Sequence, residues 1–204
     1  MPDMFCFQCE QTAGGKGCTV RGVCGKLPEV AAKQDELTCA LVGLARASKK
    51  KTPTKKANEL MMQGLFTTIT NVNFDAERIA GLIGEVRKEK ERLGGAEEMD
   101  PATLFHGETD IISLRSTLLF GMRGMAAYAW HAYVLGKEDK EVTSWFYKGM
   151  NAIGEEHTVQ EWLNLLTEFG KVNLKCMALL DEANTSAFGH PVPTKVTLDR
   201  KSVV

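Results

Sequence analysis

The sequence predicts an all-α protein, in which an N-terminal cysteine-rich loop is followed by two packed units that each resemble a three-helix bundle. Two observations lead to this fold class. From residue 28 to about residue 188, apolar residues recur at intervals of three and four, the period of an amphipathic helix, and no stretch alternates as a half-buried strand would. Residues typical of helix starts and stops divide this pattern into segments of ordinary helix length.

Residues 1–27 form the first segment, and we expect a loop there rather than a helix. Glycine adopts positive φ without strain and leaves backbone amides free to approach a bound group. Such a composition predicts a loop that folds closely around a compact object. The glycines of this segment are Gly14, Gly15, Gly17, Gly22 and Gly25.

Residues 28–93 predict the first helical unit, with three helices. Pro28 suits a first helical turn, and the apolar period predicts a helix to about Ser48. The basic stretch 49–57 ends it, and we interpret that stretch as a solvated linker rather than as a docking patch. A second helix is expected over about 57–71 and a third over about 75–93, with Asn73 as a candidate N-cap.

Residues 94–108 predict a linker, and residues 109–188 predict the second helical unit. Helices are expected from Thr109 or Asp110 to about Leu135, and from Glu138 to about Gly154. Thr158 begins the next helix with a capping box to Glu161. We expect a break near Gly170 and a last helix over about 171–187. Residues 189–204 predict an extended tail that leads toward further domains.

The two helical units show signs of an internal repeat. The segment 37–47 resembles 115–126, which aligns Gly43 with Gly121, and 59–69 resembles 144–154, which aligns Gly64 with Gly149. Two copies of a three-helix unit would account for the length of the helical region.

Composition limits the classes of function. The 204 residues carry 25 basic and 26 acidic side chains, so no excess of positive charge indicates a nucleic-acid partner or an anionic membrane. No stretch approaches the roughly 20 apolar residues of a membrane-spanning helix. The first residues lack the basic and apolar regions of a signal peptide, so we expect a cytoplasmic protein.

Four cysteines crowd the first 24 residues, with the spacing C-x2-C-x8-C-x5-C, and the rest of the chain holds two more. In a reducing compartment such clusters favour metal ligation over two disulfides. Four thiolates suit either structural zinc or an iron–sulfur cluster. The wide second spacing favours iron–sulfur, and zinc remains the alternative. The four candidate ligands are Cys6, Cys9, Cys18 and Cys24.

The neighbours of these cysteines support redox use of a bound cluster. Phe5, Phe7 and Val23 would exclude water from it. Nearby basic side chains would offset its negative charge, and both effects tune a reduction potential. The basic side chains are Lys16, Arg21 and Lys26.

The cysteine run FCFQCEQTAGGKGCTVRGVCGK (residues 5–26) resembles the N-terminus of hybrid-cluster proteins, also called prismane proteins or hydroxylamine reductases. Its spacing is similar to that of the anaerobe-type members, whose N-terminal cluster is 4Fe-4S. The resemblance continues through 64–75, 114–136 and 177–191 and covers essentially the whole chain. It implies that the four N-terminal cysteines hold a 4Fe-4S cluster.

The family's active centre is a second, hybrid Fe–S–O cluster, whose ligands lie further along longer chains. The resemblance therefore implies an electron-transfer domain that relays electrons to that centre, where hydroxylamine is reduced to ammonia, or nitric oxide is reduced. We expect a fragment or one part of a split gene, with no catalytic residue in this chain. The implied partners are an electron-donor redox protein and the remaining domains, and a homodimer is left open.

Two other functions compete with the redox interpretation. The first is a zinc-stapled helical interaction module, and the second is a folding or dimerisation scaffold in which the cluster is only a staple. Cys39 and Cys176 lie at helical positions typical of buried structural thiols. The four histidines lack the i, i+4 spacing of a helical metal site, and His131 is expected to be packed or exposed. No nucleotide-binding motif and no nucleophile arrangement is present.

Overall fold

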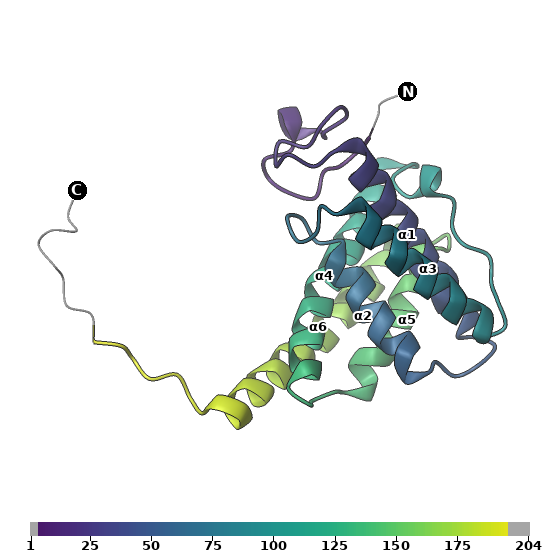
Figure 1. The fold of residues 1–204 in the computed structure, drawn as a ribbon. Coiled ribbons are helices and arrows are strands. Elements are labelled where there is room, and N and C mark those ends of the chain that lie inside the picture. Colours follow the sequence, from purple (N-terminus) through teal and green to yellow (C-terminus); the bar gives the residue numbers. More distant parts are fainter. Residues whose placement is uncertain (1–3, 196–204) are drawn as a thin grey trace, which may run out of the picture.

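The computed structural model describes residues 4–195, and the helices account for most of them (Figure 1). Within this range the only extended pairing is one isolated bridge, so the all-α prediction is confirmed. Two short 3-10 turns, η1 (Ala13–Gly15) and η2 (Pro101–Thr103), lie in the loops. The helices are α1 (Pro28–Ala47), α2 (Lys55–Thr67), α3 (Ala76–Arg92), α4 (Thr109–Val134), α5 (Lys140–Ile153) and α6 (Val159–Phe188).

Capping residues set most helix starts where the sequence predicts them. Pro28 occupies the first turn of α1, and Thr158 forms the expected capping box with Glu161. The N-cap of α3 is Asp75, which accepts from the amide of Arg78 at 3.0 Å, rather than Asn73. Asn73 instead accepts from the Asp75 amide at 2.9 Å and so supports the cap from outside the helix.

The break expected near Gly170 does not exist, because α6 runs uninterrupted for 30 residues. A glycine inside a helix costs about 1 kcal/mol relative to alanine, which packing can offset. Trp162 and Cys176, on either side of Gly170 in the sequence, are completely buried and hold both parts of α6 against the bundle. Residues 189–195 form no helix or strand, and the rest of the predicted extended tail lies outside the described residues.

The helices pack with the pairing that an internal repeat predicts. α1 lies against α3 as α4 lies against α6. The first three helices contact the last three where α1 meets α5 and where α2 meets α4. Gly64 lets α2 approach α1, because a Cβ there would lie 2.8 Å from Leu41 Cδ1. Gly149 plays the same part between α5 and α4, where a Cβ would lie 2.3 Å from Met122 Sδ. The aligned glycines therefore occupy corresponding helix crossings, and helices of both sets share one hydrophobic core.

The cysteine-rich segment lies at one end of this bundle, over the start of α1 and beside the loop that carries η2 (Figure 1). The C-terminal part of α6 projects from the opposite end. Across the described residues, no helix combines the length and apolar character that a membrane crossing requires.

Candidate metal centre

Cys6 and Cys18 are brought together by the backbone. The two residues form an isolated antiparallel bridge, in which the Cys6 amide donates to the Cys18 carbonyl at 3.1 Å and the Cys18 amide donates to the Cys6 carbonyl at 2.8 Å. The amide of Met4 continues the pairing by donating to the Thr19 carbonyl at 3.2 Å. The loop between Cys6 and Cys18 is therefore closed at its base and carries Cys9.

The surroundings of the Cys18 sulfur favour its thiolate form. The Ala13 amide approaches it at 3.4 Å and the Thr12 hydroxyl lies 3.8 Å away. Backbone donors, first that of Ala13 and then that of Val23, lower the pKa of Cys18 and outweigh the opposing effect of burial. The thiolate is the form of cysteine that ligates metals.

Cys9 and Cys24 lie on the two turns that flank this bridge. The Cys9 carbonyl accepts from the Thr12 amide at 3.2 Å, which closes the first turn. Around Cys24, the Gly22 amide donates to the Lys26 carbonyl at 2.9 Å. Gly22 leaves room there, because a Cβ would lie 3.1 Å from the Cys24 sulfur, a tight contact. Within residues 4–195, no three cysteine, histidine or acidic side chains converge on a single-ion site.

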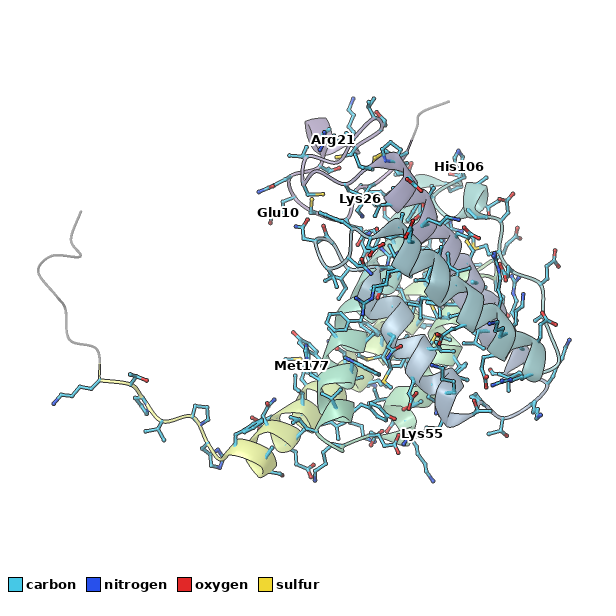
Figure 2. The ribbon with its side chains drawn as sticks, viewed as in Figure 1. Glu10, Arg21, Lys26, Lys55, His106 and Met177 are labelled. Carbon is cyan, nitrogen blue, oxygen red and sulfur yellow. The ribbon has the colours of Figure 1, made fainter. Side chains whose placement is uncertain are left out.

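Lys26 links the cysteine segment to the bundle, and Figure 2 places it beneath that segment at the same end as His106. Its side chain is only 2% exposed. The ammonium lies 3.8 Å from the Cys6 sulfur and donates to Gln34 Oε1 at 2.6 Å. Gln34 in turn donates to the Asn73 carbonyl at 3.1 Å, which ties α1 to the turn between α2 and α3.

Four phenylalanines seat the cysteine segment on the helices. Phe7 packs against Phe105 at 5.4 Å and against Phe120 of α4 at 5.5 Å, measured between ring centroids. Phe5 joins the group through Phe7 at 5.3 Å. This aromatic group excludes water on the bundle side of Cys6. Two of the residues expected to exclude water are exposed instead, Phe5 at 37% and Val23 at 58%, so Phe7 is the one that is packed inward.

Among the three expected cations, only Lys26 is buried beside a cysteine, while Lys16 and Arg21 are exposed. Sequence reasoning missed a second buried cation, Arg123 of α4, which is 1% exposed. The signal was present, because a lone arginine at a core position of an apolar helix is unusual. Arg123 Nη2 donates to Thr38 Oγ1 at 3.1 Å.

The other two cysteines are buried in the bundle, as the sequence predicts. Cys39 is 1% exposed and Cys176 is fully buried, and burial raises the pKa of each thiol to about 12. The exposed side chain of His131 contacts Phe66, with ring centroids 5.5 Å apart. These residues are therefore structural.

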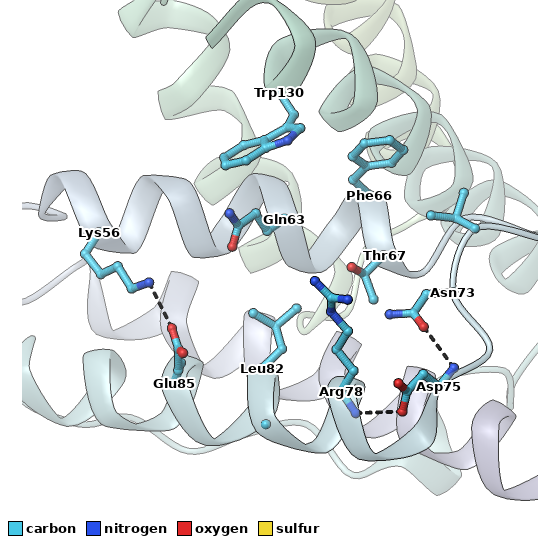
Figure 3. A pocket seen from close by; sticks show the side chains of 12 residues that line it. Lys56, Gln63, Phe66, Thr67, Asn73, Asp75, Arg78, Leu82, Glu85 and Trp130 are labelled. Carbon is cyan, nitrogen blue, oxygen red and sulfur yellow. Dashed lines mark hydrogen bonds and ion pairs between the residues drawn. The ribbon is translucent and has the colours of Figure 1, made fainter. Parts of the chain in front are cut away.

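A groove of about 840 Å³ runs between α2 and α3 (Figure 3). Lys56 and Glu85 form an ion pair at 2.8 Å across one end, and Arg78 and Asp75 line the other. Trp130 of α4 lies on its α2 side. No cysteine lines this groove, so it is separate from the candidate metal centre.

The residues of the cysteine segment fit a thiolate-ligated iron–sulfur cluster. Their donor set consists of four free thiols within 19 positions of the chain. A backbone amide is directed at one sulfur and a buried ammonium at another, as expected around sulfur ligands that must carry negative charge. Both donors tune the electron affinity of a bound cluster.

Comparison with known proteins identifies relatives along the whole chain. A family model described as the Prismane/CO dehydrogenase family matches residues 4–203. The hydroxylamine reductase of Maridesulfovibrio salexigens is 40% identical over 98% of this chain and 42% of its own length. That of Syntrophobacter fumaroxidans is 41% identical over 97% of this chain and 43% of its own. That of Methanocella arvoryzae is 38% identical over the same shares. The chain thus spans about two-fifths of the length of these relatives.

Proposed function

The chain belongs to the Prismane/CO dehydrogenase family, and from this we propose that it is the electron-transfer portion of a hydroxylamine reductase. The four N-terminal cysteines hold a 4Fe-4S cluster. This cluster accepts single electrons from a donor redox protein and passes them on. The hybrid Fe–S–O cluster, and with it the reduction of hydroxylamine to ammonia, belongs to the part of the relatives' length that this chain does not span.

The observation that carries this proposal is the electrostatic setting of the sulfurs. The Ala13 amide favours the thiolate form of Cys18, the form that ligates iron, and the Lys26 ammonium lies 3.8 Å from the Cys6 sulfur, where it opposes the negative charge of a bound cluster. The backbone bridge between Cys6 and Cys18 brings two of the four ligands together.

The residues of this chain bind the cluster, shield it from water and compensate its charge. The cysteines bind the cluster, and the four phenylalanines keep water away from its inner side. Lys26 and the amides oppose its negative charge, which favours electron uptake. Exposed Arg21 and Glu10 lie on the outer face of the segment (Figure 2), where a donor protein can approach. The reducing cytoplasm keeps these thiols available as ligands.

Anaerobic reconstitution with iron and sulfide tests the proposal. We expect a broad brown absorption and about four irons per chain. Stoichiometric zinc without a visible band would instead support a zinc-stapled interaction module. The chain alone should not turn over hydroxylamine, and such turnover would contradict the assignment of the active centre to the remaining part of the protein.

A matched pair of variants tests the ligand assignment. Cys9→Ser should abolish cluster incorporation and keep the helical circular dichroism, because Cys9 lies outside the hydrophobic core of the bundle. Cys39→Ala is the control, since this buried thiol lies in α1 and should leave the iron content unchanged. Normal iron content in Cys9→Ser would remove that residue from the ligand set, and loss of all helicity would show that the cluster nucleates the fold.

A further inference from the structure

Arg123 carries a buried charge that forms no salt bridge among the described residues. Its side chain lies within the bundle at 1% exposure, and its one hydrogen bond runs to the hydroxyl of Thr38. Nε and Nη1 have no hydrogen-bond partner, and among residues 4–195 no acidic side chain forms a salt bridge with it. A guanidinium in such a place is costly unless an anion lies nearby.

Two series of contacts connect Arg123 to the candidate metal centre. Its guanidinium lies over the ring of Phe120, 5.4 Å from the centroid, and Phe120 packs against Phe7, the neighbour of Cys6. On the other side, Thr38 donates to the Gln34 carbonyl at 2.8 Å. The side chain of Gln34 holds Lys26 beside the Cys6 sulfur. Arg123 therefore faces the side of the cysteine segment that is turned toward the helices.

One carboxyl group, that of Asp35, balances this charge only in part. Asp35 acts electrostatically on both Arg123 and Lys26; burial raises its pKa to about 6, so at pH 7 it is mostly ionised and supplies one negative charge. Lys26, like Arg123, forms no salt bridge among the described residues, so one carboxyl group faces two buried cations. Arg123 and Lys26 together thus place excess positive charge at the base of the cysteine segment.

We propose that Arg123 is a positioning residue that supplies a buried counter-charge to the anionic iron–sulfur cluster and raises its reduction potential. The inference rests on the proposed function, because four thiolates give such a cluster net negative charge. Reduction adds a further electron, so a fixed cation in a low-dielectric interior stabilises the reduced form more than the oxidised form. A bound cluster then adds to the partial compensation that Asp35 gives the desolvated Arg123.

A redox titration of the reconstituted chain tests the electrostatic part. Arg123→Met keeps much of the apolar volume and removes the charge, so the midpoint potential of the cluster should fall. Arg123→Lys keeps the charge and should remain close to wild type. Arg21→Met is the matched control, because Arg21 is exposed, is nearer to the cysteines in the sequence and is screened by solvent. If Arg123→Met does not fold, Arg123→Gln removes the charge while keeping a donor for Thr38.

The increase in Tm on cluster loading distinguishes an electrostatic role of Arg123 from a purely structural one, which would leave that increase unchanged. Without the cluster, Arg123→Met should raise Tm, since it removes a desolvated cation that Asp35 compensates only in part. With the cluster, the same variant loses a favourable charge interaction, so the increase in Tm on loading should be smaller than in wild type. A structural role would change both forms alike.

The possible results separate the two proposals. A wild-type chain that takes up no iron–sulfur cluster would overturn the proposed function and the inference with it. If the wild-type cluster is normal but the midpoint potential shifts no more in Arg123→Met or Arg123→Gln than in Arg21→Met, the inference alone is overturned. The inference is also overturned if the midpoint potential of Arg123→Lys falls as far as that of Arg123→Met, because the lysine variant retains the charge.

Discussion

The two cysteines of the bundle, Cys39 and Cys176, should be nearly inert toward alkylation in the folded chain. Burial raises the pKa of both thiols to about 12, and their exposed fractions are 1% and 0%. At pH 8 a thiol of ordinary pKa near 8.5 is roughly one quarter thiolate, whereas one of pKa about 12 is ionised in roughly one molecule in ten thousand. Ionisation alone therefore slows the reaction by about 10³ relative to the unfolded chain.

Iodoacetamide labelling of the cluster-free chain at pH 8, followed by peptide mass spectrometry, measures this ratio. The same peptides labelled in denaturant give the reference rate at each position. Cys6, Cys9 and Cys24 are partly exposed and should be labelled in the native cluster-free chain, and protected after reconstitution. If Cys39 or Cys176 reacted natively within tenfold of its denatured rate, burial would not control its reactivity. Confirmation would leave the four N-terminal thiols as the ones available for iron.

Three further predictions concern stability. Gly170→Ala should stabilise the chain by about 1 kcal/mol, or about 2–4 °C in Tm, because a Cβ at this position meets no atom within 4 Å. Gly121→Ala should destabilise the chain, since a Cβ there would lie 2.7 Å from the Phe169 ring. Melts followed by circular dichroism distinguish the rise in Tm from the fall. Glu98→Gln should cost about 1–3 kcal/mol at pH 7 in a urea titration. Chiefly through hydrogen bonds from Arg87, the pKa of Glu98 is lowered in the folded chain, so its contribution is present above the ordinary glutamate pKa and is lost as the pH falls; a cost unchanged at pH 3 would contradict this. Thr158→Ala should cost about 0.5–2 kcal/mol by the same titration through loss of the capping box, and no change would mean that solvent replaces the cap.

Local signals predicted the helices well because caps and prolines act within one turn. Pro28 and Thr158 begin their helices as the sequence indicates. The break expected at Gly170 was wrong because a local signal cannot register the tertiary burial of Trp162 and Cys176. The same limit explains the omission of Arg123, whose position beside the cysteine segment depends on the tertiary contacts of its side chain with Thr38 of α1 and of Phe120 with Phe7.

The cysteine segment and the bundle differ in what stabilises them. The helices share one extensive hydrophobic core, whereas the segment's own buried cluster consists of Met4, Cys18 and Ala31, with Cys6 packed against it. So small an apolar cluster contributes little toward the conformational entropy of ordering a glycine-rich loop. The loop therefore depends on ligation and on the contacts of Lys26 and the phenylalanines, while the helices do not. Arg123, unlike Lys26, lies on a helix of the bundle, so its charge is held in place by the large hydrophobic core rather than by the loop itself.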